Sequence, residues 1–426
     1  MGVGARIGWT QASAAGPLAS QGSAWSSAAV PQPQSAPPRL APVIPLRPRR
    51  RAGLSILYTG QMGGTCMQRA DALRDLGHDV VFVPSGHPST TGSLKRVLAF
   101  QLYRVLHHLK RHPDTYLANF RLLRWARRRR FDLVWIDKGV SIRPRTLRRL
   151  KRLLPGVRII AYSPDDMFNP VNQSQRYLDS IALYDLHVTT KSFNVQELEE
   201  QGARDVMFVE NAYDPSLHKS MLLSPEDRRH FSADVGFVGV YEEERGDLML
   251  RLAENGIPVT VRGPGWARFG KSHPALSIHD EYLDAAEYPK AVNATRINLG
   301  FLRRANRDVQ TQRSIEIPAC GGFMLAERTD EHARLFEEGV EAEYFDCFEE
   351  LLAKCRHYLD HEAARERIAR RGQQRCVTGR YSNQGRLAAV LDRALRNGPA
   401  DRAKQRFPAE ILPLRWRERR QALGLA

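Results

Sequence analysis

The chain has 426 residues, of which 42% are hydrophobic, and it carries a formal net charge of +17 at pH 7. This length suffices for two domains with a sizeable core each, and one compact domain would be unusual. No run of about 18 apolar residues occurs, which excludes a membrane-spanning helix. The five cysteines form no CxxC pair and are odd in number, so we expect a reducing cytoplasm rather than a disulfide or zinc scaffold.

The positive charge comes mostly from arginine and raises the question of an anionic partner. The basic residues are spread over the N-terminal tail, the stretches near 104–130 and 143–152, and the C terminus. They show neither interleaved aromatic residues nor a known nucleic-acid motif, so we expect nucleic acid not to be the partner. A basic face can equally hold a peripheral enzyme against anionic lipid. We therefore expect a cytoplasmic protein, with peripheral contact to the inner membrane face as an alternative.

Residues 1–50 are rich in Ala, Ser, Pro and Gly. They have neither the apolar core of a secretory signal nor a helical period. We expect a disordered tail there, or a start assigned too far upstream.

A strand–helix–strand unit follows the tail. Residues 54–58 are predicted as a strand, 67–76 as a helix and 79–83 as the next strand. The loop after the first strand contains Gly63 and Gly64, which would let a substrate approach the backbone. The loop lacks a dinucleotide-binding fingerprint, and a simple tight turn explains it equally well.

Two basic helices are predicted over 94–109 and 115–130, followed by a strand over 131–136. Asp137 and Lys138 stand at the carboxyl end of that strand, where doubly wound sheets bind their ligands. A ligand site and a solvated turn are equally good explanations of these two residues.

The strand predicted over 157–162 leads into Ser-Pro-Asp-Asp-Met-Phe-Asn-Pro at 163–170. Asp165 and Asp166 follow the strand directly and have prolines on both sides, which is more than a turn usually needs. We predict that one of the two is a general base. The alternative is that one caps the following helix, and the two roles can also be divided between them.

Strands predicted over 185–189 and 206–209 complete the first half. Lys191 lies near the positive end of the helix that follows the first of these strands, which makes it a candidate for binding an anion. The polar, turn-rich stretch from residue 211 to about residue 231 is predicted to be a linker.

The second half repeats the pattern with a strand over 233–238 and a helix over 242–254. Gly239 follows the strand, and a glycine turn at a helix N terminus can bind pyrophosphate through free N–H groups. The three glutamates at 242–244 satisfy the same helix dipole internally. Arg245 follows them directly and can reach an anion, so we predict that Gly239 and Arg245 bind one.

Residues 265–272, Gly-Trp-Ala-Arg-Phe-Gly-Lys-Ser, match the P-loop pattern. A working P-loop must open a helix whose first amides cradle the phosphates. Here His273 and Pro274 follow, and 276–279 has the pattern of an extended segment, so we expect no P-loop function.

The segment 308–326 contains the most specific candidates: a short amphipathic helix, a Gly-Gly stop and a buried strand. Arg313 and Glu316 are three residues apart and share one helical face. The guanidinium can fork onto phosphate oxygens and the carboxylate can accept from ribose hydroxyls, which suits a nucleotide diphosphate sugar. The alternative is an ion pair on a solvated face.

This segment resembles the end of the Glu-(seven residues)-Glu motif of GT-B glycosyltransferases, with Glu316 at the second Glu and Asp308 in place of the first. The sequence segments 163–169 and 313–322 are similar to those of the spore-maturation-protein-B-like (CgeB-like) glycosyltransferases. The resemblance covers roughly residues 54–390. It implies an α/β protein with the GT-B fold, in which two Rossmann-like doubly wound domains face a cleft.

The resemblance also assigns roles to the parts of the chain. It implies an acceptor-side domain at 51–220, a nucleotide-sugar-binding domain at 221–385, and a C-terminal helix and basic tail at 386–426, with the helix returning to the first domain. Gly63 and Gly64 would then lie on the acceptor side. The donor site would contain Gly239, Arg245, Arg313, Glu316 and Lys191, with Asp165 and Asp166 as the catalytic pair.

We therefore expect a metal-independent hexosyltransferase whose nucleotide sugar is a substrate, with no cofactor. Its acceptor would be a glycan, a lipid-linked molecule or a protein. No Asp-x-Asp triplet is present, so Arg313, Arg245 and Lys191 would stabilise the leaving phosphate in place of a metal. The rival hypothesis is a non-catalytic nucleotide- or glycan-binding protein with the same fold.

Overall fold

The computed structural model describes residues 53–86 and 112–396. The predicted tail at 1–50, the predicted helix at 94–109 and the basic C-terminal tail after residue 396 lie outside the described residues. Within the described ranges, no helix is long and apolar enough to cross a membrane. All five cysteines are free thiols, and only Cys347 among them is exposed.

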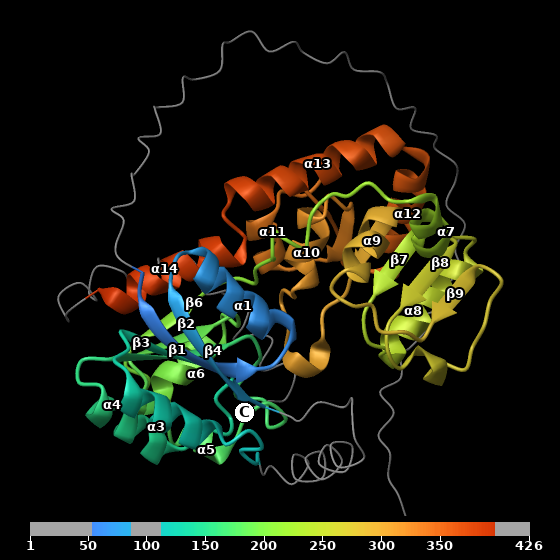
Figure 1. Cartoon of the computed structure of the whole chain (residues 1–426). Helices are drawn as coiled ribbons and strands as arrows, with labels where there is room; N and C mark the ends of the chain where they lie inside the picture. The colour runs from blue at the N-terminus through green and yellow to red at the C-terminus, as the bar shows by residue number, and fades with distance from the viewer. Residues whose placement is uncertain (1–52, 87–111, 397–426) are drawn as a thin grey trace, which may run out of the picture. The chain divides into compact units, whose positions relative to one another are not determined.

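Six parallel strands form the first sheet, in the order β2-β1-β3-β4-β5-β6 (Figure 1). Their buried apolar runs are typical of parallel strands covered on both faces. The strands are β1 (Ser55–Gln61), β2 (Asp79–Ser85), β3 (Leu133–Asp137), β4 (Arg158–Ser163), β5 (Leu186–Thr189) and β6 (Val206–Phe208). Each of them matches a predicted strand to within about three residues at either end.

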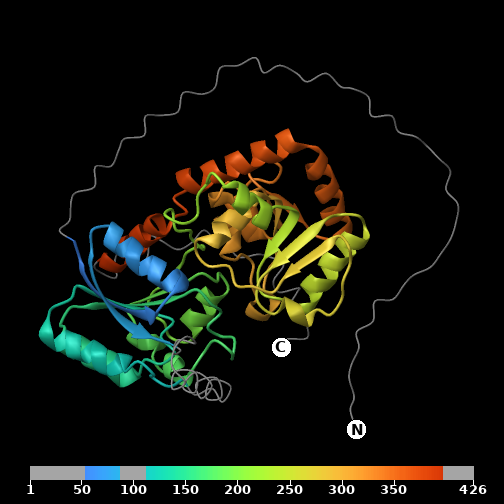
Figure 2. The ribbon, with the colours of Figure 1, turned by 45° about the vertical axis from the view of Figure 1, so that its right-hand side comes forward.

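Helices cover both faces of the first sheet. One face packs on α1 (Gly64–Asp75) and α14 (Asn383–Leu395), and the other packs on α3 (Ala118–Arg128) and α4 (Pro144–Leu153). In Figure 2 the teal helices α3 and α4 stay together on one side of this sheet, while the blue α1 and the red α14 lie on the other. The helix predicted at 383–396 is therefore α14, and it packs against the first sheet as the resemblance implied.

The second sheet also has six parallel strands, in the order β12-β11-β10-β7-β8-β9. They are β7 (Ala233–Val238), β8 (Val259–Arg262), β9 (Leu276–His279), β10 (Thr295–Gly300), β11 (Met324–Glu327) and β12 (Glu343–Phe345). No strand is shared between the two sheets. The predicted domain boundary at 220/221 falls in the segment between β6 and β7, and the boundary at 385/386 falls inside α14.

The faces of the second sheet are covered by two groups of helices. On one face lie α8 (Glu243–Glu254) and α12 (Phe348–Asp360), and on the other lie α9 (Glu287–Ala294), α10 (Arg313–Ala319) and α11 (Asp330–Leu335). The long α13 (Glu362–Thr378) contributes apolar side chains to both cores. The remaining short helices are α5 (Gln175–Leu178), α6 (Asn194–Glu200) and α7 (Pro225–Phe231).

The central helix α10 is buried from Ser314 to Ala319, which corrects the prediction of an amphipathic helix. The helix α13 packs against α10, and Cys376 Sγ lies 3.8 Å from the carbonyl oxygen of Ile315. On the side where solvent was expected, His218 covers Glu316, while Arg313 at the start of the helix keeps 36% of its side chain exposed. The helix ends as predicted, with Gly321 at φ 79°, a left-handed conformation that glycine adopts without steric cost.

Each sheet has one switch point, where consecutive strands along the chain diverge to opposite sides. In the first sheet it lies between β1 and β3, and in the second between β7 and β10. Ligands of open α/β sheets bind outside the carboxyl ends of the strands at such points. The loops that follow these four strands are therefore where the fold places a site.

Candidate active site

Arg245 spans the switch point of the second sheet. Its Nη1 donates to the carbonyl oxygen of Val240 at 3.0 Å, and its Nη2 donates to the carbonyl oxygen of Leu302 at 2.9 Å. Val240 follows β7 and Leu302 follows β10, so one guanidinium connects the two loops that diverge there. The sequence prediction of Arg245 as an anion-binding residue thus falls at the position that the topology favours.

Arg313 reaches the same loop from the other side. Its Nε donates to the carbonyl oxygen of Val238 at 3.3 Å, and its guanidinium carbon lies 3.9 Å from the ring centroid of Tyr288. Arg313 and Arg245 therefore flank Gly239, one holding the residue before it and the other the residue after it. The structure brings together these three predicted donor-binding residues.

The backbone of Gly239 differs from what we expected. Its N–H donates to the carbonyl oxygen of Arg262 at 2.9 Å, and its carbonyl oxygen accepts from the indole Nε1 of Trp266 at 2.9 Å. The amide is therefore not free to bind pyrophosphate. A Cβ at Gly239 would lie 2.5 Å from the ring of Phe237, so packing alone accounts for glycine at this position.

The charge of Arg245 is only partly balanced. Its Nη2 lies 3.4 Å from Glu242, and its buried Nε has no hydrogen-bond partner among the described residues. Burial lowers the pKa of Arg245, although Glu242 and Glu327 oppose this effect. Burial also raises the pKa of Glu327 above its usual value, even though its carboxylate accepts from the N–H of Leu302 at 2.5 Å.

Glu316 does not face open space, which corrects the expectation for this residue. It is 3% exposed and accepts from Arg313 Nη1 at 2.5 Å. His218 Nε2 lies 3.5 Å from the other carboxylate oxygen of Glu316. His218 Nδ1 accepts from the backbone N–H of Asp214 at 3.0 Å, so its Nε2 carries the proton and points to Glu316. The predicted pair with Arg313 exists, but its carboxylate is buried while the Arg313 side chain is 36% exposed.

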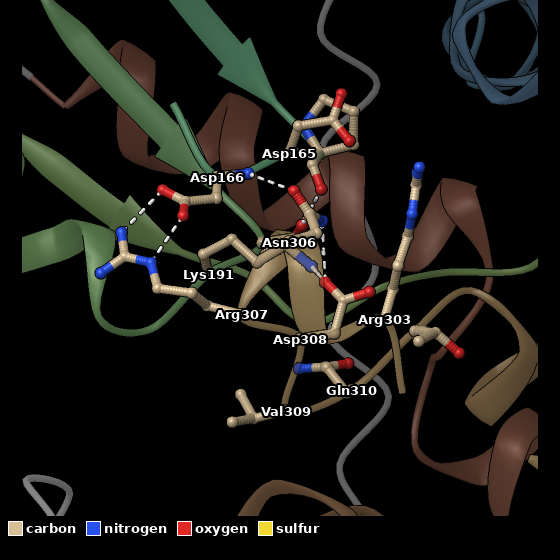
Figure 3. Close-up of polar contacts among 12 residues, drawn as sticks. Asp165, Asp166, Lys191, Arg303, Asn306, Arg307, Asp308, Val309 and Gln310 are labelled. Atoms are coloured by element: carbon tan, nitrogen blue, oxygen red, sulfur yellow. Dashed lines mark hydrogen bonds and ion pairs between the residues drawn. The ribbon is translucent and has the colours of Figure 1, made fainter. Parts of the chain in front are cut away.

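Asp166, one of the two candidates for the general base, forms an ion pair with an arginine from the loop after β10. Arg307 Nε and Nη2 donate to its two carboxylate oxygens at 2.6 and 2.8 Å (Figure 3). Asn194 Nδ2 and the N–H of Phe168 each donate to Oδ1 at 3.0 Å. Burial alone would raise the pKa of Asp166, but these donors hold it below its usual value. Asp166 is therefore a poor proton acceptor in this arrangement.

Lys191 has a different partner from the one expected. Its Nζ lies 2.5 Å from Asp308, and both side chains are buried. Asn306 Nδ2 donates to the same oxygen of Asp308 at 2.8 Å, while Asn306 Oδ1 accepts from the N–H of Asp166 at 3.3 Å. Figure 3 shows these side chains converging, with Arg303 extending away from them. Lys191 is thus committed to an ion pair, and its role in donor binding stays a prediction.

Asp165 is the more accessible of the two predicted catalytic carboxylates. Its side chain is 30% exposed and lies 2.5 Å from Lys138 Nζ. Lys138 has a positive φ of 45°, an uncommon conformation for a residue with a side chain. Lys138, which follows β3, and Asp165, which follows β4, are therefore adjacent in space.

Asp137 is neither a solvated turn residue nor an open ligand site. It is 5% exposed and accepts from Arg69 Nε at 2.8 Å, Arg69 Nη2 at 3.1 Å and the Tyr58 hydroxyl at 2.7 Å. Nearby, Gly63 and Gly64 are exposed and have φ values of 128° and 54°. A Cβ on either would meet nothing within 4 Å. Their left-handed backbone requires glycine, and the acceptor-side role stays a prediction.

The P-loop-like stretch confirms the argument against a P-loop. After Gly265 the chain forms one turn of 3-10 helix, Trp266–Arg268, and then β9. The N–H groups of Gly265 and Trp266 both donate to Asp280. Among the residues that the structure describes, no group of three or more His, Cys, Asp or Glu side chains could hold a metal ion.

Comparison with known proteins agrees with this architecture. Residues 245–392 match the family model described as glycosyl transferase-like. No curated protein matches the sequence of this chain.

Solved structures are similar over most of the chain. HepE of Anabaena, in complex with UDP and glucose, is 15% identical with a TM-score of 0.54, over 80% of this chain and 100% of that chain. A glycosyltransferase of Rickettsia africae is 12% identical with a TM-score of 0.54, over 82% and 100%. An α-glucosyltransferase in complex with UDP-glucose and DNA is 13% identical with a TM-score of 0.55, over 82% and 100%. The protein has the GT-B fold, as the sequence predicted.

Several residues that surround Asp166 and Glu316 were not predicted. Arg307, Asn306 and Glu197 surround Asp166, and His218 contacts Glu316. Arg307 and Asp166 are 141 residues apart, so no local pattern could have paired them. The only sequence signal was the density of arginines after β10, at positions 303, 304 and 307.

Proposed function

We propose that this protein is a glycosyltransferase that moves a hexose from a nucleotide-sugar donor to an acceptor. The observation that carries the proposal is the pair of arginines, Arg245 and Arg313, on either side of Gly239 at the switch point of the second sheet. A nucleoside diphosphate brings two adjacent phosphates, and two forked guanidinium groups suit both of them.

The proposed roles follow from charge and exposure. Arg313 is 36% exposed at its side chain and would contact the donor diphosphate directly. Arg245 would stabilise the negative charge that develops on the leaving phosphate. Glu316 would hold Arg313 in place, because it is buried between Arg313 and His218, rather than bind the ribose with both oxygens.

The transfer forms one bond and breaks one. An acceptor hydroxyl oxygen bonds to the anomeric carbon, the bond from that carbon to the phosphate oxygen breaks, and the hydroxyl proton passes to a carboxylate. We assign this proton to Asp165, because Asp166 is engaged by Arg307 on both oxygens while Asp165 is partly exposed. Asp166 would act as a positioning residue. Arginine in place of a metal makes the reaction metal-independent.

The comparisons support the donor class and the family. The structurally similar HepE was solved with UDP-glucose, and an α-glucosyltransferase of similar fold also binds UDP-glucose. We propose a uridine diphosphate hexose as the first donor to test. The sequence segments 163–169 and 313–322 further support membership of the CgeB-like glycosyltransferases, with a glycan, a lipid-linked molecule or a protein as acceptor.

One observation favours the rival function, a nucleotide- or glycan-binding protein without catalysis. Asp166, the carboxylate at the position where related folds place chemistry, is neutralised by Arg307. If Asp165 took no proton either, the donor would bind without being consumed. Thermal stabilisation with no turnover would therefore favour the rival.

The test has two stages. Thermal unfolding is measured with UDP-hexoses and other nucleotide sugars, because a ligand stabilises the native state by mass action. Turnover of the stabilising donor is then measured in excess EDTA. We expect both stabilisation and chelator-insensitive turnover. Activity lost in EDTA and restored by magnesium or manganese would overturn the metal-independent assignment.

The donor site is tested by Arg313→Ala. We expect donor affinity to fall roughly tenfold to a hundredfold, as for the loss of a charged hydrogen bond of about 1.5–3 kcal/mol. Arg370→Ala is the matched control, because Arg370 is an exposed arginine on α13 that pairs with Glu366. Equal donor affinity in both variants would reduce Arg313 to a structural ion pair.

A further inference from the structure

The helices α3 and α4 present a strongly basic surface away from the first sheet. They pack against each other, and neither contains an acidic residue. Each exposes four arginines: Arg121, Arg124, Arg127 and Arg128 on α3, and Arg145, Arg148, Arg149 and Arg152 on α4. Within residues 53–86 and 112–396, none of these eight takes part in an ion pair. This surface, called here the α3–α4 face, therefore lacks its counter-charge.

The α3–α4 face also exposes large apolar side chains. Leu117 is 60% exposed, Phe120 57% and Trp125 37%. Successive helical residues are about 100° apart, so positions 120, 121, 124, 125, 127 and 128 all lie on one side of α3. Phe120 and Trp125 are thus interleaved with four arginines on a single face, and the exposed Leu117 stands immediately before the helix.

Leu117 is held outward by an unfavourable backbone conformation. It stands immediately before α3 with φ 53° and ψ 37°, in the left-handed region. This conformation is sterically unfavourable for a residue with a Cβ. Asp114 caps the helix at this end, accepting from the N–H groups of Ala118 and Asn119 at 2.6 and 3.0 Å. The cap fixes the helix start and leaves Leu117 exposed.

We propose that the α3–α4 face docks the protein onto an anionic lipid bilayer. Aromatic and aliphatic side chains lie at the boundary of headgroups and acyl chains, while arginines beside them contact lipid phosphates. Each arginine near an anionic membrane adds to the attraction. Nucleic acid would also match the arginines, and its bases can stack on aromatic side chains; Phe120 and Trp125 do lie among these arginines, contrary to the expectation from the sequence. It offers no apolar layer, however, for the exposed aliphatic side chain of Leu117. The exposed apolar side chains therefore favour a lipid bilayer over nucleic acid as the partner.

Co-sedimentation of the full chain with vesicles tests the proposal. Vesicles of phosphatidylglycerol and phosphatidylcholine are compared with phosphatidylcholine alone, and binding is expected only to the former. We expect Arg121→Gln/Arg124→Gln/Arg128→Gln to weaken binding by about tenfold or more. The matched control Arg367→Gln/Arg370→Gln/Arg371→Gln removes the same charge from exposed positions on α13. It should bind within about twofold of the unaltered protein. Equal losses in both triple variants would overturn the proposal, because the attraction would then reflect net charge alone.

A second variant isolates the apolar contribution. Phe120→Ser/Trp125→Ser keeps every charge and should weaken vesicle binding, while its thermal unfolding temperature stays unchanged because both side chains are exposed. Brominated lipids should quench the tryptophan fluorescence of the unaltered protein more than that of Trp125→Phe. The bilayer assignment would be overturned if Phe120→Ser/Trp125→Ser bound vesicles as tightly as the unaltered protein. It would also be overturned if the unaltered protein bound oligonucleotides more tightly than vesicles and the double variant kept that binding.

Discussion

The switch points of the two sheets each contain one buried arginine, but the two arginines are held differently. In the first sheet Arg69 meets Asp137 through two hydrogen bonds, and the Tyr58 hydroxyl adds a third to the same carboxylate. In the second sheet Arg245 is held mainly by backbone carbonyl oxygens, with Glu242 at 3.4 Å and its Nε unpaired within the described part of the chain.

The difference shows in the protonation equilibria of the two guanidinium groups. Burial alone would lower the pKa of Arg69, but Asp137 raises it well above its ordinary value. For Arg245 burial prevails, and the pKa is lowered. The first arginine completes its charge balance inside the protein. The second retains positive charge that an external anion can balance, and we propose that the first position serves structure and the second serves binding.

The largest expected effect is on stability at the first switch point. Asp137→Asn leaves the charge of Arg69 buried without its partner, which typically costs about 3–5 kcal/mol. Urea denaturation should show this loss as a lower midpoint with an unchanged slope. Asp71→Asn, on the exposed side of α1 and paired with Arg74, serves as the control and should unfold like the unaltered protein. A variant Asp137→Asn of full stability would remove the contrast between the two sheets.

A smaller effect is expected at the second switch point, and on binding rather than folding. Arg245→Met keeps the volume of the side chain but removes its charge. We expect the affinity for the stabilising nucleotide sugar to fall roughly tenfold to a hundredfold, corresponding to about 1.5–3 kcal/mol. Calorimetric titration measures this change, with Arg251→Met on the exposed face of the same helix as control. Undiminished affinity in folded Arg245→Met would make Arg245 as structural as Arg69.

The smallest effect concerns Glu327, which lies close to Arg245. Burial raises the pKa of Glu327, so the folded state takes up a proton there more readily than the unfolded state. The stabilising contribution of this proton is present below the unfolded pKa and is lost as pH rises through the folded pKa. Compared with Glu327→Gln, the unaltered protein should therefore gain stability as pH falls from neutral toward about 4.5.

Urea denaturation over this pH range measures the difference for Glu327, with the exposed Glu366→Gln as control. Parallel curves for Glu327→Gln and the unaltered protein would show that Glu327 titrates normally. In that case the charge at the second switch point would be better balanced than we infer.

The fold was predictable because its strands are buried on both faces. The strand predicted at 233–238 and the extended segment predicted at 276–279 coincide with β7 and β9, since apolar runs between turn residues are typical of parallel sheets. The helix α7 was taken for a linker because its sequence, Pro-Glu-Asp-Arg-Arg-His-Phe, is almost entirely polar. Its N terminus nevertheless has a capping box from Ser224 to Asp227, a local signal that could have identified it.

The site was predictable only where local sequence determines position. Arg245 and Arg313 could be placed because each follows a strand of a recognisable unit. The burial of Glu316 could not be predicted, because it depends on His218, which is about a hundred residues away in sequence. The engagement of Asp166 by Arg307 likewise depends on how the loop after β10 meets the loop after β4. Tertiary contacts of this kind leave no periodic pattern in a single sequence.

The position of α14 has a consequence for how the protein is made. Leu387, Val390, Leu391 and Ala394 belong to the same core as β1 and β3, although they follow β1 by more than 320 residues and β3 by at least 250 in the order of synthesis. Domains generally fold as they leave the ribosome, starting from the N terminus. Here the sheet that is translated first has only α1 on one apolar face, and the rest of that face stays uncovered until nearly the whole chain has emerged. The half that is made first is therefore finished last, and a chain that stops before residue 383 would leave that face open to chaperones and proteases.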